Sequence, residues 1–230
     1  MIKILSWNIR QGGGSRILKI VKTIEQSEAP IITLNEFRNN ASGIQLRTAL
    51  LKLNYRYQTV TAAPANDNAV LIASKFPCHS RLFPKADEEF PHNIVQAEFD
   101  AFYLIGVYLP HKKKHKLFEF MTEMIKSYDK PCVIAGDYNT GKNYIDQKGN
   151  SFWYTEELEH FEAAGMIDAF RHKQGDVKEY SWYSHQGNGF RYDQTYVEES
   201  LVALVTDCYY NHKVREDNIS DHSAMVLELG

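Results

Sequence analysis

Short apolar runs separated by turn residues dominate this chain, and they restrict its fold more than any other feature. Four runs rich in β-branched and aromatic residues follow one another, with Asn, Asp, Pro or Gly between them, at 55–61, 69–74, 94–99 and 102–108. Consecutive strands of this kind form hairpins. The pattern therefore favours sheets packed face to face with helices outside over a doubly wound parallel sheet.

Further elements continue this pattern on both sides of the four runs. Strands are expected at 2–7, 30–35, 132–135, 180–184, 190–197, 201–209 and 224–229. Helical spacing of apolar residues predicts helices over 17–24, 42–53, 117–125 and 156–164, the first of them capped by Ser15. The expected fold class is α/β (α+β).

Length and charge bound the kind of protein. With 230 residues and 43% hydrophobic content, the chain can bury one sizeable core, so we expect a single domain over residues 1–230. The 26 Lys and Arg residues against 29 Asp and Glu residues give a net charge of −3. A global positive field is therefore excluded, and binding to a polyanion requires a local basic patch.

The cysteines and the hydropathy pattern indicate the compartment. Cys78, Cys132 and Cys208 are scattered and lack CxxC spacing, which argues against a disulfide framework and against a zinc site. The first residues do not resemble a signal peptide, and no stretch reaches the about 18 to 20 apolar residues that cross a bilayer. We expect a cytoplasmic protein in a reducing environment, without membrane contact.

Polar side chains follow several of the short strands, at the point where each strand ends. The sites are Asn8, Glu36, Tyr108, the segment 136–139 and the segment 220–222. Taken singly, such a residue is more often a turn or cap residue, and Tyr108 is equally well a packed strand aromatic. Active-site groups favour the ends of rigid strands, so the joint occurrence predicts one shared rim.

The motifs that surround these polar residues occur in a characteristic order. They are SWNI (6–9), LNE (34–36), VLIASKFP (70–77), GVYLP (106–110), AGDYN (135–139), GMIDAFRH (165–172), YSWY (180–183), RYD (191–193) and SDH (220–222). In this order they resemble the endonuclease/exonuclease/phosphatase superfamily, and within it the exonuclease III-like apurinic/apyrimidinic endonucleases. The resemblance implies a four-layered α/β sandwich, in which two packed mixed β-sheets are flanked by helices.

The resemblance also implies roles for individual residues in a metal-dependent phosphodiesterase, most simply a DNA nuclease that uses an Asp-activated water. The implied catalytic residues are Asp137, Asn139, His222, Asp193 and Tyr108, and the implied metal-binding residues are Glu36, Asn8 and Asp221. Asp137 would activate the water, and Asp193 would orient His222 toward a phosphate oxygen. A hard cation, Mg²⁺ or Mn²⁺, would offset the phosphate charge.

Some positions depart from the family pattern. Arg10 stands where many members have Asn or Asp, His111 stands where repair enzymes often have Asn, and the segment 184–189 is short for a DNA-contacting loop. Arg10 is thereby a candidate phosphate contact. The sequence therefore indicates phosphodiester hydrolysis more strongly than it indicates specificity for duplex DNA.

The basic run 111–116 (HKKKHK) is the candidate patch for nucleic acid, although most such runs are solvated faces. His111, Lys112 and Lys113 follow the proposed phosphate site directly, and Arg10 and Arg38 would extend the patch. Trp182 and Phe190, together with Tyr192, resemble the apolar pocket of abasic-site endonucleases, or else form a hairpin core.

Nucleic acid, specifically DNA, is therefore the expected partner, and no feature indicates an obligate protein partner. The alternative is a phosphatase acting on a small phosphorylated metabolite or inositol phosphate, which the net acidity and short loops favour. A non-catalytic binding module is a second alternative. It is disfavoured because the complete set of polar strand ends is present.

Overall fold

The strands form two six-stranded sheets and a hairpin in the computed structural model, which describes residues 1–149 and 151–230. The first sheet has the order β13 (Val205–Asn211), β14 (Ala224–Leu229), β1 (Ile2–Asn8), β2 (Ile31–Phe37), β4 (Ala69–Ser74), β3 (Tyr57–Val60). The second has the order β5 (His79–Leu82), β6 (Ile94–Glu98), β7 (Tyr103–Tyr108), β8 (Cys132–Asp137), β12 (Asp193–Glu198), β9 (Met166–Asp168). The hairpin is β10 (Trp182–Tyr183) with β11 (Gly189–Phe190).

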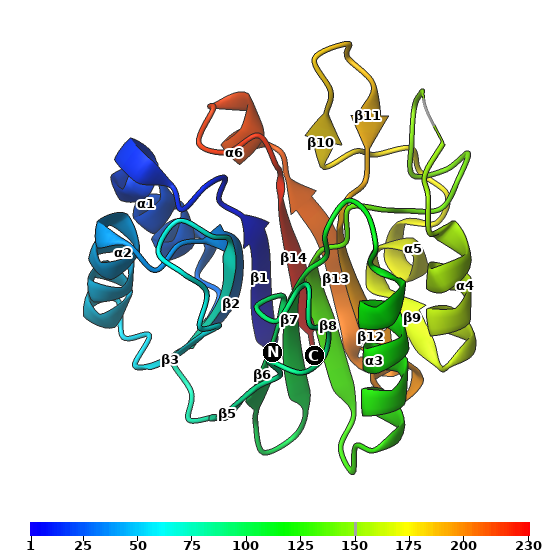
Figure 1. Ribbon diagram of the computed structural model, residues 1–230, viewed down its shortest axis with the longest axis horizontal. Helices are drawn as coiled ribbons and strands as arrows, with labels where there is room; N and C mark the ends of the chain where they lie inside the picture. The colour runs from blue at the N-terminus through cyan, green and yellow to red at the C-terminus, as the bar shows by residue number, and fades with distance from the viewer. Residues whose placement is uncertain (150) are drawn as a thin grey trace.

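Helices cover the outer faces of both sheets (Figure 1). Residues of α1 (Ile17–Ser27) and α2 (Ala41–Lys52) share a buried cluster with the first sheet, and residues of α3 (His115–Lys126) and α4 (Thr155–Ala163) share one with the second. Two shorter helices are α5 (Ala169–Gln174) and α6 (Lys213–Glu216). The predicted four-layered sandwich of two packed mixed sheets flanked by helices is confirmed.

The core between the sheets follows from the two-residue period of a strand, which sends neighbouring side chains to opposite faces. In β1, Ile4 faces the other sheet and Leu5 faces the helices. In β8, Val133 faces the other sheet and Ile134 faces α3 and α4. Central strands are thus buried on both faces, which explains why they read as unbroken apolar runs.

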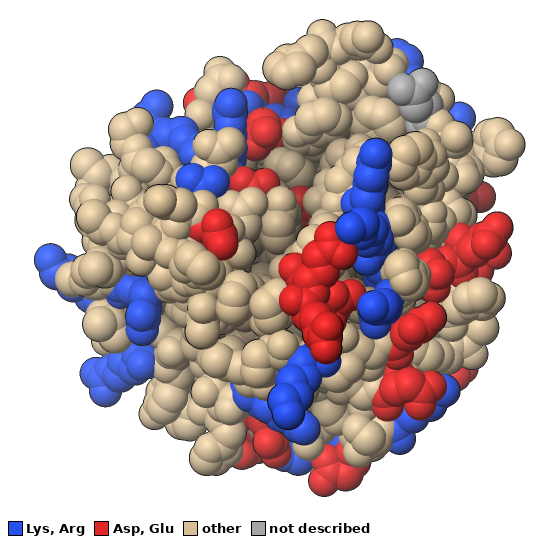
Figure 2. Space-filling view, viewed as in Figure 1, with Lys and Arg blue, Asp and Glu red and all other residues tan. Residues whose placement is uncertain are grey.

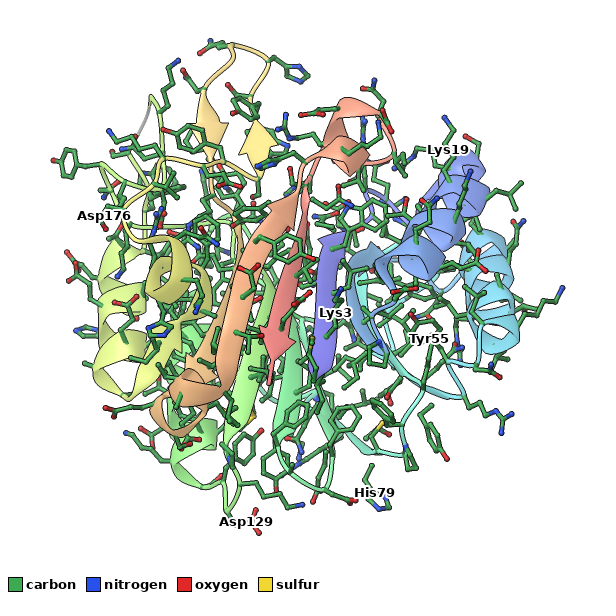
Figure 3. The ribbon with its side chains drawn as sticks, turned by 180° about the vertical axis from the view of Figure 1, so that it is seen from behind. Lys3, Lys19, Tyr55, His79, Asp129 and Asp176 are labelled. Carbon is green, nitrogen blue, oxygen red and sulfur yellow. The ribbon has the colours of Figure 1, made fainter. Side chains whose placement is uncertain are left out.

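Each sheet contains one parallel pair of strands, and the two pairs set the position of the site. β1 runs parallel to β2 through the crossover α1, and β7 runs parallel to β8 through α3. The carboxyl ends of parallel strands lie at the same edge of a sheet. Seen from behind, β1, β13 and β14 run side by side, and His79 and Asp129 mark the end of the molecule opposite the β10–β11 hairpin (Figure 3).

Three local predictions are wrong in detail. The predicted strand 190–197 is broken after β11, because the backbone N–H of Arg191 donates to the carbonyl of Asp146 instead of a sheet neighbour. The first part of the predicted strand 201–209 is a 3₁₀ helix (Glu199–Leu204) that buries Leu201 in the core. Ser15 lies within a 3₁₀ turn (Gly14–Arg16), and Arg16 takes the N-cap position of α1.

Four short elements were not predicted: β5, β9, α5 and α6. All four residues of β5 are exposed, so this edge strand carries no alternation of apolar and polar residues.

No helix within residues 1–149 and 151–230 is long and apolar enough to cross a membrane.

Candidate active site

Polar side chains from both sheets meet at the carboxyl ends of the two parallel pairs. The amide Nδ2 of Asn8, at the end of β1, donates to Glu36 Oε1 at 3.1 Å and to Asp137 Oδ2 at 2.9 Å. Asn8 is fully buried. Its amide therefore joins a carboxylate of the first sheet to a carboxylate of the second by hydrogen bonds.

The molecular surface is hollowed near the upper end of the face shown in Figure 2. Acidic side chains lie inside this hollow, and Lys and Arg side chains lie on its rim (Figure 2).

The backbone holds Glu36 in a conformation that a residue other than glycine rarely adopts, with φ at 53°. Its carboxylate Oε2 accepts from the backbone N–H of Gln11 at 2.7 Å, and its carbonyl accepts from the N–H of Gly12 at 2.7 Å. The hydroxyl of Tyr108 approaches Oε1 at 3.5 Å. Strain of this kind persists where the surroundings impose it, and here it directs the carboxylate of Glu36 toward Asn8.

The end of β8 carries Gly136 and Asp137, and the tight turn that follows carries Asn139. Gly136 is required there, since a Cβ would lie 1.8 Å from the carbonyl oxygen of Val107 on the neighbouring strand. Asp137 Oδ1 accepts from the N–H of Asn139 at 2.9 Å, and Asn139 Nδ2 donates to the carbonyl of Leu109 at 3.0 Å. Burial raises the pKa of Asp137 to about 7, because the charged form loses hydration.

A buried histidine and aspartate lie beside Asp137. The Nδ1 of His222 is 2.7 Å from Asp193 Oδ2, and both residues are buried. Asp193 pairs with Asp137 across β12 and β8. Burial lowers the pKa of His222, but the nearby carboxylates, above all Asp193, outweigh burial and raise that pKa to about 10. His222 is therefore an imidazolium at neutral pH.

A serine hydroxyl and an indole N–H hold the loop that carries Asp221 and His222. Ser220 Oγ donates to the carbonyl of Asn8 at 2.6 Å, and the indole N–H of Trp7 donates to the carbonyl of His222 at 3.2 Å. Asp221 is half-buried, and its Oδ2 lies 3.4 Å from the indole nitrogen of Trp182 and 3.9 Å from Nε of Arg10. These contacts place the end of the chain against the end of β1.

Two sets of side chains offer ligand atoms for a cation. The ligand atoms of Asp137, Asp193 and His222 lie within 4.8 Å of one another. A histidine that binds a metal must be neutral, whereas His222 is protonated and hydrogen-bonded to Asp193. These three side chains therefore suit a protonated histidine between carboxylates better than a metal site. Glu36 and Asp221 are only partly buried and carry carboxylate oxygens, and this donor chemistry fits a hard cation such as Mg²⁺. Oδ1 of the buried Asn8 already accepts from the N–H of Arg10 at 2.9 Å.

With this geometry established, a comparison with protein families assigns the chain. The model of the endonuclease/exonuclease/phosphatase family matches residues 5–222, which include every polar group described above. The chain belongs to the endonuclease/exonuclease/phosphatase family. The resemblance read from the motifs is thereby confirmed.

Relatives of the family share the full length of the chain. An exodeoxyribonuclease of Streptococcus pneumoniae is 24% identical, with 99% of each chain covered. Among solved structures, an AP endonuclease from Archaeoglobus fulgidus superposes with a TM-score of 0.88 at 18% identity, covering 100% of this chain and 99% of that one. The 3′ phosphatase NExo from Neisseria, bound to a product DNA hairpin, gives a TM-score of 0.86 at 18% identity, with 100% of both chains covered.

The residues predicted to bind substrate lie around this endonuclease/exonuclease/phosphatase site at different depths. Arg10 is exposed beside Asp221, in keeping with a position on the rim. Arg38 is half-buried, and its Nε reaches Asn68 at 3.4 Å. His111, Lys112 and Lys113 are exposed, and Lys113 pairs with Glu89 at 2.7 Å.

The basic run 111–116 is not a uniform surface patch. Lys114 is fully buried, and its Nζ donates to the carbonyls of Tyr138 at 2.8 Å and Asn139 at 2.7 Å. Burial lowers the pKa of Lys114 to about 7. The interpretation of all four lysines as a phosphate-facing patch is wrong for Lys114, because its ammonium group is buried and bound to the turn that follows Asp137.

The predicted aromatic residues cluster beside His222. Trp182 pairs with Phe190 across the hairpin, and its ring lies 5.5 Å from that of Tyr192 and 6.4 Å from that of His222. Phe152, which was not predicted, joins the cluster at 5.6 Å from Phe190. Both interpretations of these residues fit in part, since the cluster is a small hydrophobic core and also borders the site.

Sequence reasoning missed two side chains at the site. Asn68 donates to the hydroxyl of Tyr108 at 3.1 Å from the loop that precedes β4. Asn35 donates to the carbonyl of Val107 at 2.5 Å and so joins the two sheets. The signal for Asn35 was present in LNE (34–36), where an amide interrupts a buried strand. Asn68 lies among other turn residues and carries no such signal.

Proposed function

We propose that this chain is a metal-dependent phosphodiesterase that cleaves DNA, with a cytoplasmic location. The observation that carries the proposal is the bridge formed by Asn8 between Glu36 and Asp137, with the His222–Asp193 pair beside it. The names of the relatives, an exodeoxyribonuclease and an AP endonuclease, support DNA as the substrate. Three free thiols, Cys78, Cys132 and Cys208, agree with a reducing compartment.

Asp137 orients and deprotonates the attacking water in this proposal. A general base works best when its pKa lies near the working pH, and burial brings the pKa of Asp137 to about 7. The bond from the N–H of Asn139 to Oδ1 and the bond from Asn8 to Oδ2 fix the plane of the carboxylate. The water can then be held in line with the scissile phosphate.

His222 and Tyr108 supply the positive charge and the donor that a phosphate needs. The protonated ring of His222, oriented by Asp193, donates to a nonbridging phosphate oxygen. Burial first and the carboxylate of Glu36 second raise the pKa of Tyr108, so its hydroxyl stays protonated and can also donate. Both groups act where negative charge grows in the transition state.

Glu36 would hold the cation, with Asn8 orienting that carboxylate and Asp221 completing the set. Mg²⁺ is the proposed ion and Mn²⁺ the substitute, since a bound Mg²⁺ keeps several waters and needs few protein ligands. When bound, the ion supplies charge neutralisation at the phosphoryl oxygens.

Phosphatase activity is the second candidate function. The net charge of −3 disfavours long-range attraction of a polyanion, and one solved structure with this fold is a 3′ phosphatase. Removal of a 3′ phosphate from a DNA end uses the same polar groups as phosphodiester cleavage. A phosphatase that does not act on DNA would instead hydrolyse a small phosphorylated metabolite or inositol phosphate.

A substrate panel tests the proposal. The substrates are intact duplex, duplex with an abasic site, 3′-phosphorylated duplex, RNA, inositol phosphates and p-nitrophenyl phosphate, each with Mg²⁺, Mn²⁺ or EDTA. We expect cleavage of DNA that EDTA abolishes and that Asp137→Asn lowers. Turnover of the soluble monoesters without any DNA product would overturn DNA as the substrate. Undiminished DNA cleavage in EDTA would overturn the metal.

A further inference from the structure

We infer that Trp153 is a stacking platform for a nucleobase, and that the substrate strand therefore still carries its base next to the scissile phosphate. The inference rests on the proposed DNA cleavage and deepens it. Trp153 is 59% exposed, although large aromatic side chains are normally buried. An exposed, firmly held tryptophan beside a polar site indicates a recognition surface.

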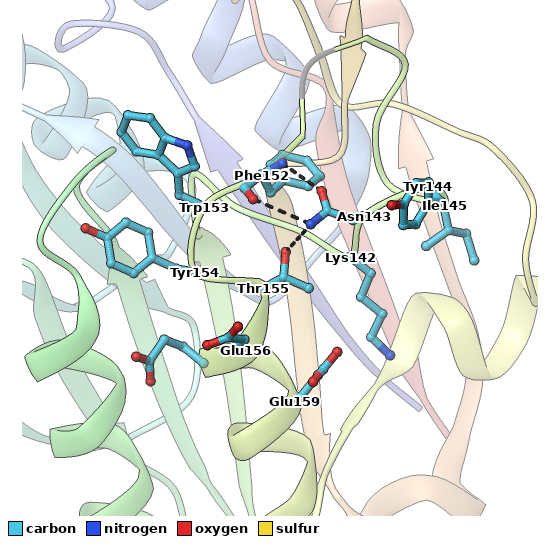
Figure 4. Close-up of a pocket in the computed structure, with 11 residues that line it drawn as sticks. Lys142, Asn143, Tyr144, Ile145, Phe152, Trp153, Tyr154, Thr155, Glu156 and Glu159 are labelled. Carbon is cyan, nitrogen blue, oxygen red and sulfur yellow. Dashed lines mark hydrogen bonds between the residues drawn. The ribbon is translucent and has the colours of Figure 1, made fainter.

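The backbone that carries Trp153 is anchored to the catalytic turn. Thr140, three residues after Asp137 and fully buried, donates through its hydroxyl to the carbonyl of Trp153 at 2.5 Å. Asn143 accepts from the N–H of Phe152 at 2.7 Å and donates to Thr155 Oγ1 at 3.1 Å. Figure 4 shows the indole of Trp153 pointing away from these hydrogen bonds. The ring is thus presented outward by a braced segment.

Trp153 also forms a wall of the cavity that adjoins the proposed catalytic groups. This cavity has a volume of about 430 Å³, and its walls include Phe152, Trp153, Phe190, Tyr192, His111 and Asn139. Asn139 contacts Asp137, so a nucleotide in the cavity would have its phosphate within reach of the site. Trp182 is not among the residues that line this cavity in the described part of the chain, in contrast to the predicted pocket.

A positive charge beside the Trp153 ring suits the phosphate of a nucleotide whose base stacks on that ring. The Nζ of Lys112 lies 5.0 Å from the centroid of the Trp153 ring, and the ring of His111 lies 6.2 Å from it. Burial first, and then Lys114 and Lys112, lower the pKa of His111, which disfavours a charge on that ring and leaves Lys112 as the cation beside Trp153. An aromatic face next to a lysine provides for a base and for its phosphate at once.

Aromatic walls distinguish a base from a bare sugar. Every nucleobase has a π-face that can stack, whereas an abasic deoxyribose has none. Loss of a stacking aromatic side chain weakens binding by roughly 5- to 150-fold per base. Trp153 is therefore predicted to determine the preference of this site for base-bearing over abasic nucleotides.

The test compares Trp153→Ala with the wild type on two matched duplexes, with a normal nucleotide or a tetrahydrofuran abasic analogue beside the scissile phosphate. We expect kcat/KM to fall by roughly 5- to 150-fold on the normal duplex and less than about 3-fold on the abasic duplex. Trp153→Phe should restore most of the loss, because it keeps an aromatic face. Tyr144→Ala is the matched control, since Tyr144 is exposed nearby but does not line the 430 Å³ cavity.

A binding readout separates recognition from folding. In EDTA, binding of a short oligothymidylate should quench the fluorescence of the wild type more than that of Trp153→Phe, because the variant keeps Trp7 and Trp182 and loses only the indole on which the base would stack. Equal losses on both duplexes, or no loss on either, would overturn the inference while DNA cleavage stands. A wild type that cleaves neither duplex would overturn the proposed function itself.

Discussion

Asp193 and His222 are 29 residues apart in the chain, and Oδ2 of Asp193 lies 2.7 Å from Nδ1 of His222. Both side chains are buried, and Asp193 pairs directly with Asp137 across neighbouring strands. The pair keeps a positive charge next to the proposed general base. This arrangement has a direct consequence for the pH dependence of activity.

Replacement of Asp193 should change the pH range in which the enzyme works. In the wild type His222 has a pKa of about 10 and stays protonated through neutral pH. In Asp193→Asn the largest raising charge is lost while burial still lowers the pKa, so His222 should lose its proton, and activity should decline, at a lower pH than in the wild type. The measurement is kcat/KM between pH 5.5 and about 9, a range that spans the ordinary histidine pKa. A variant whose profile has the same shape as that of the wild type would disprove the role of Asp193.

Replacement of Glu36 should weaken the binding of Mg²⁺, and a titration with Mg²⁺ measures this change. Glu36→Gln removes the charge that would hold the cation but keeps the hydrogen-bond acceptor for Asn8. We expect the Mg²⁺ concentration for half-maximal activity to rise by at least about 10- to 100-fold, the range for loss of a group that only supports a metal ligand, because Glu36 would bind the ion directly. Isothermal titration with Mg²⁺ gives an independent readout. An unchanged Mg²⁺ requirement would place the metal elsewhere.

Lys114 should position the catalytic turn. Lys114→Met keeps the length of the side chain but leaves the carbonyls of Tyr138 and Asn139 without their donor. A small displacement of Asp137 can cost about 100-fold in rate, so we expect kcat to fall by about 10- to 100-fold with KM nearly constant. Lys116→Met, at an exposed neighbouring position, is the control. If the Lys114 variant lost only thermal stability and kept full kcat, the role would be purely structural.

A buried ionic cluster should make a large contribution to stability. Asp146 accepts from Nε of Arg191 at 2.6 Å, and Arg191, also bonded to Asp168, is fully buried. Asp146→Asn breaks this pairing and should lower the free energy of unfolding by about 3 to 5 kcal/mol in urea titrations. Asp176→Asn, on the exposed surface, is the control and should change it by less than about 0.5 kcal/mol. Equal stability of the two variants would contradict the prediction.

The same cluster predicts how stability responds to acid. Burial opposes ionisation of Asp146, but Arg191 and Arg171 outweigh burial and lower its pKa below 3.8. The stabilisation is therefore present above about pH 3.8 and is lost as the pH falls through the lower pKa of the folded state. In Asp146→Asn the decline of stability between pH 4 and about 2 should be shallower than in the wild type.

The layers and the convergence of the polar strand ends could be predicted from the sequence because both depend on local signals. Two-residue alternation marks the strands, and Asn8, Glu36 and Asp137 interrupt apolar runs at the ends of strands. Two parallel pairs then bring those ends to one edge of the sandwich. The roles assigned to these residues stay predictions until the variants are measured.

The missed features depend on partners far away in the chain. Lys114 belongs to a run that reads as a solvated surface, and its burial follows from carbonyls about two dozen residues later. Arg191 breaks a predicted strand because Asp146 and Asp168 bind it from other elements. A local pattern carries no information about such long-range partners, so propensity alone misplaces both residues.

The most direct test of the central claim is the single-turnover rate of Asp137→Asn on a DNA duplex with Mg²⁺. The claim is that Asp137, held by Asn8 beside the imidazolium of His222, is the general base of a hydrolytic site. We predict a rate about 10²- to 10⁴-fold below the wild type, with unchanged thermal unfolding and substrate binding. A folded Asp137→Asn variant that cleaves DNA within about 3-fold of the wild-type rate would contradict the claim.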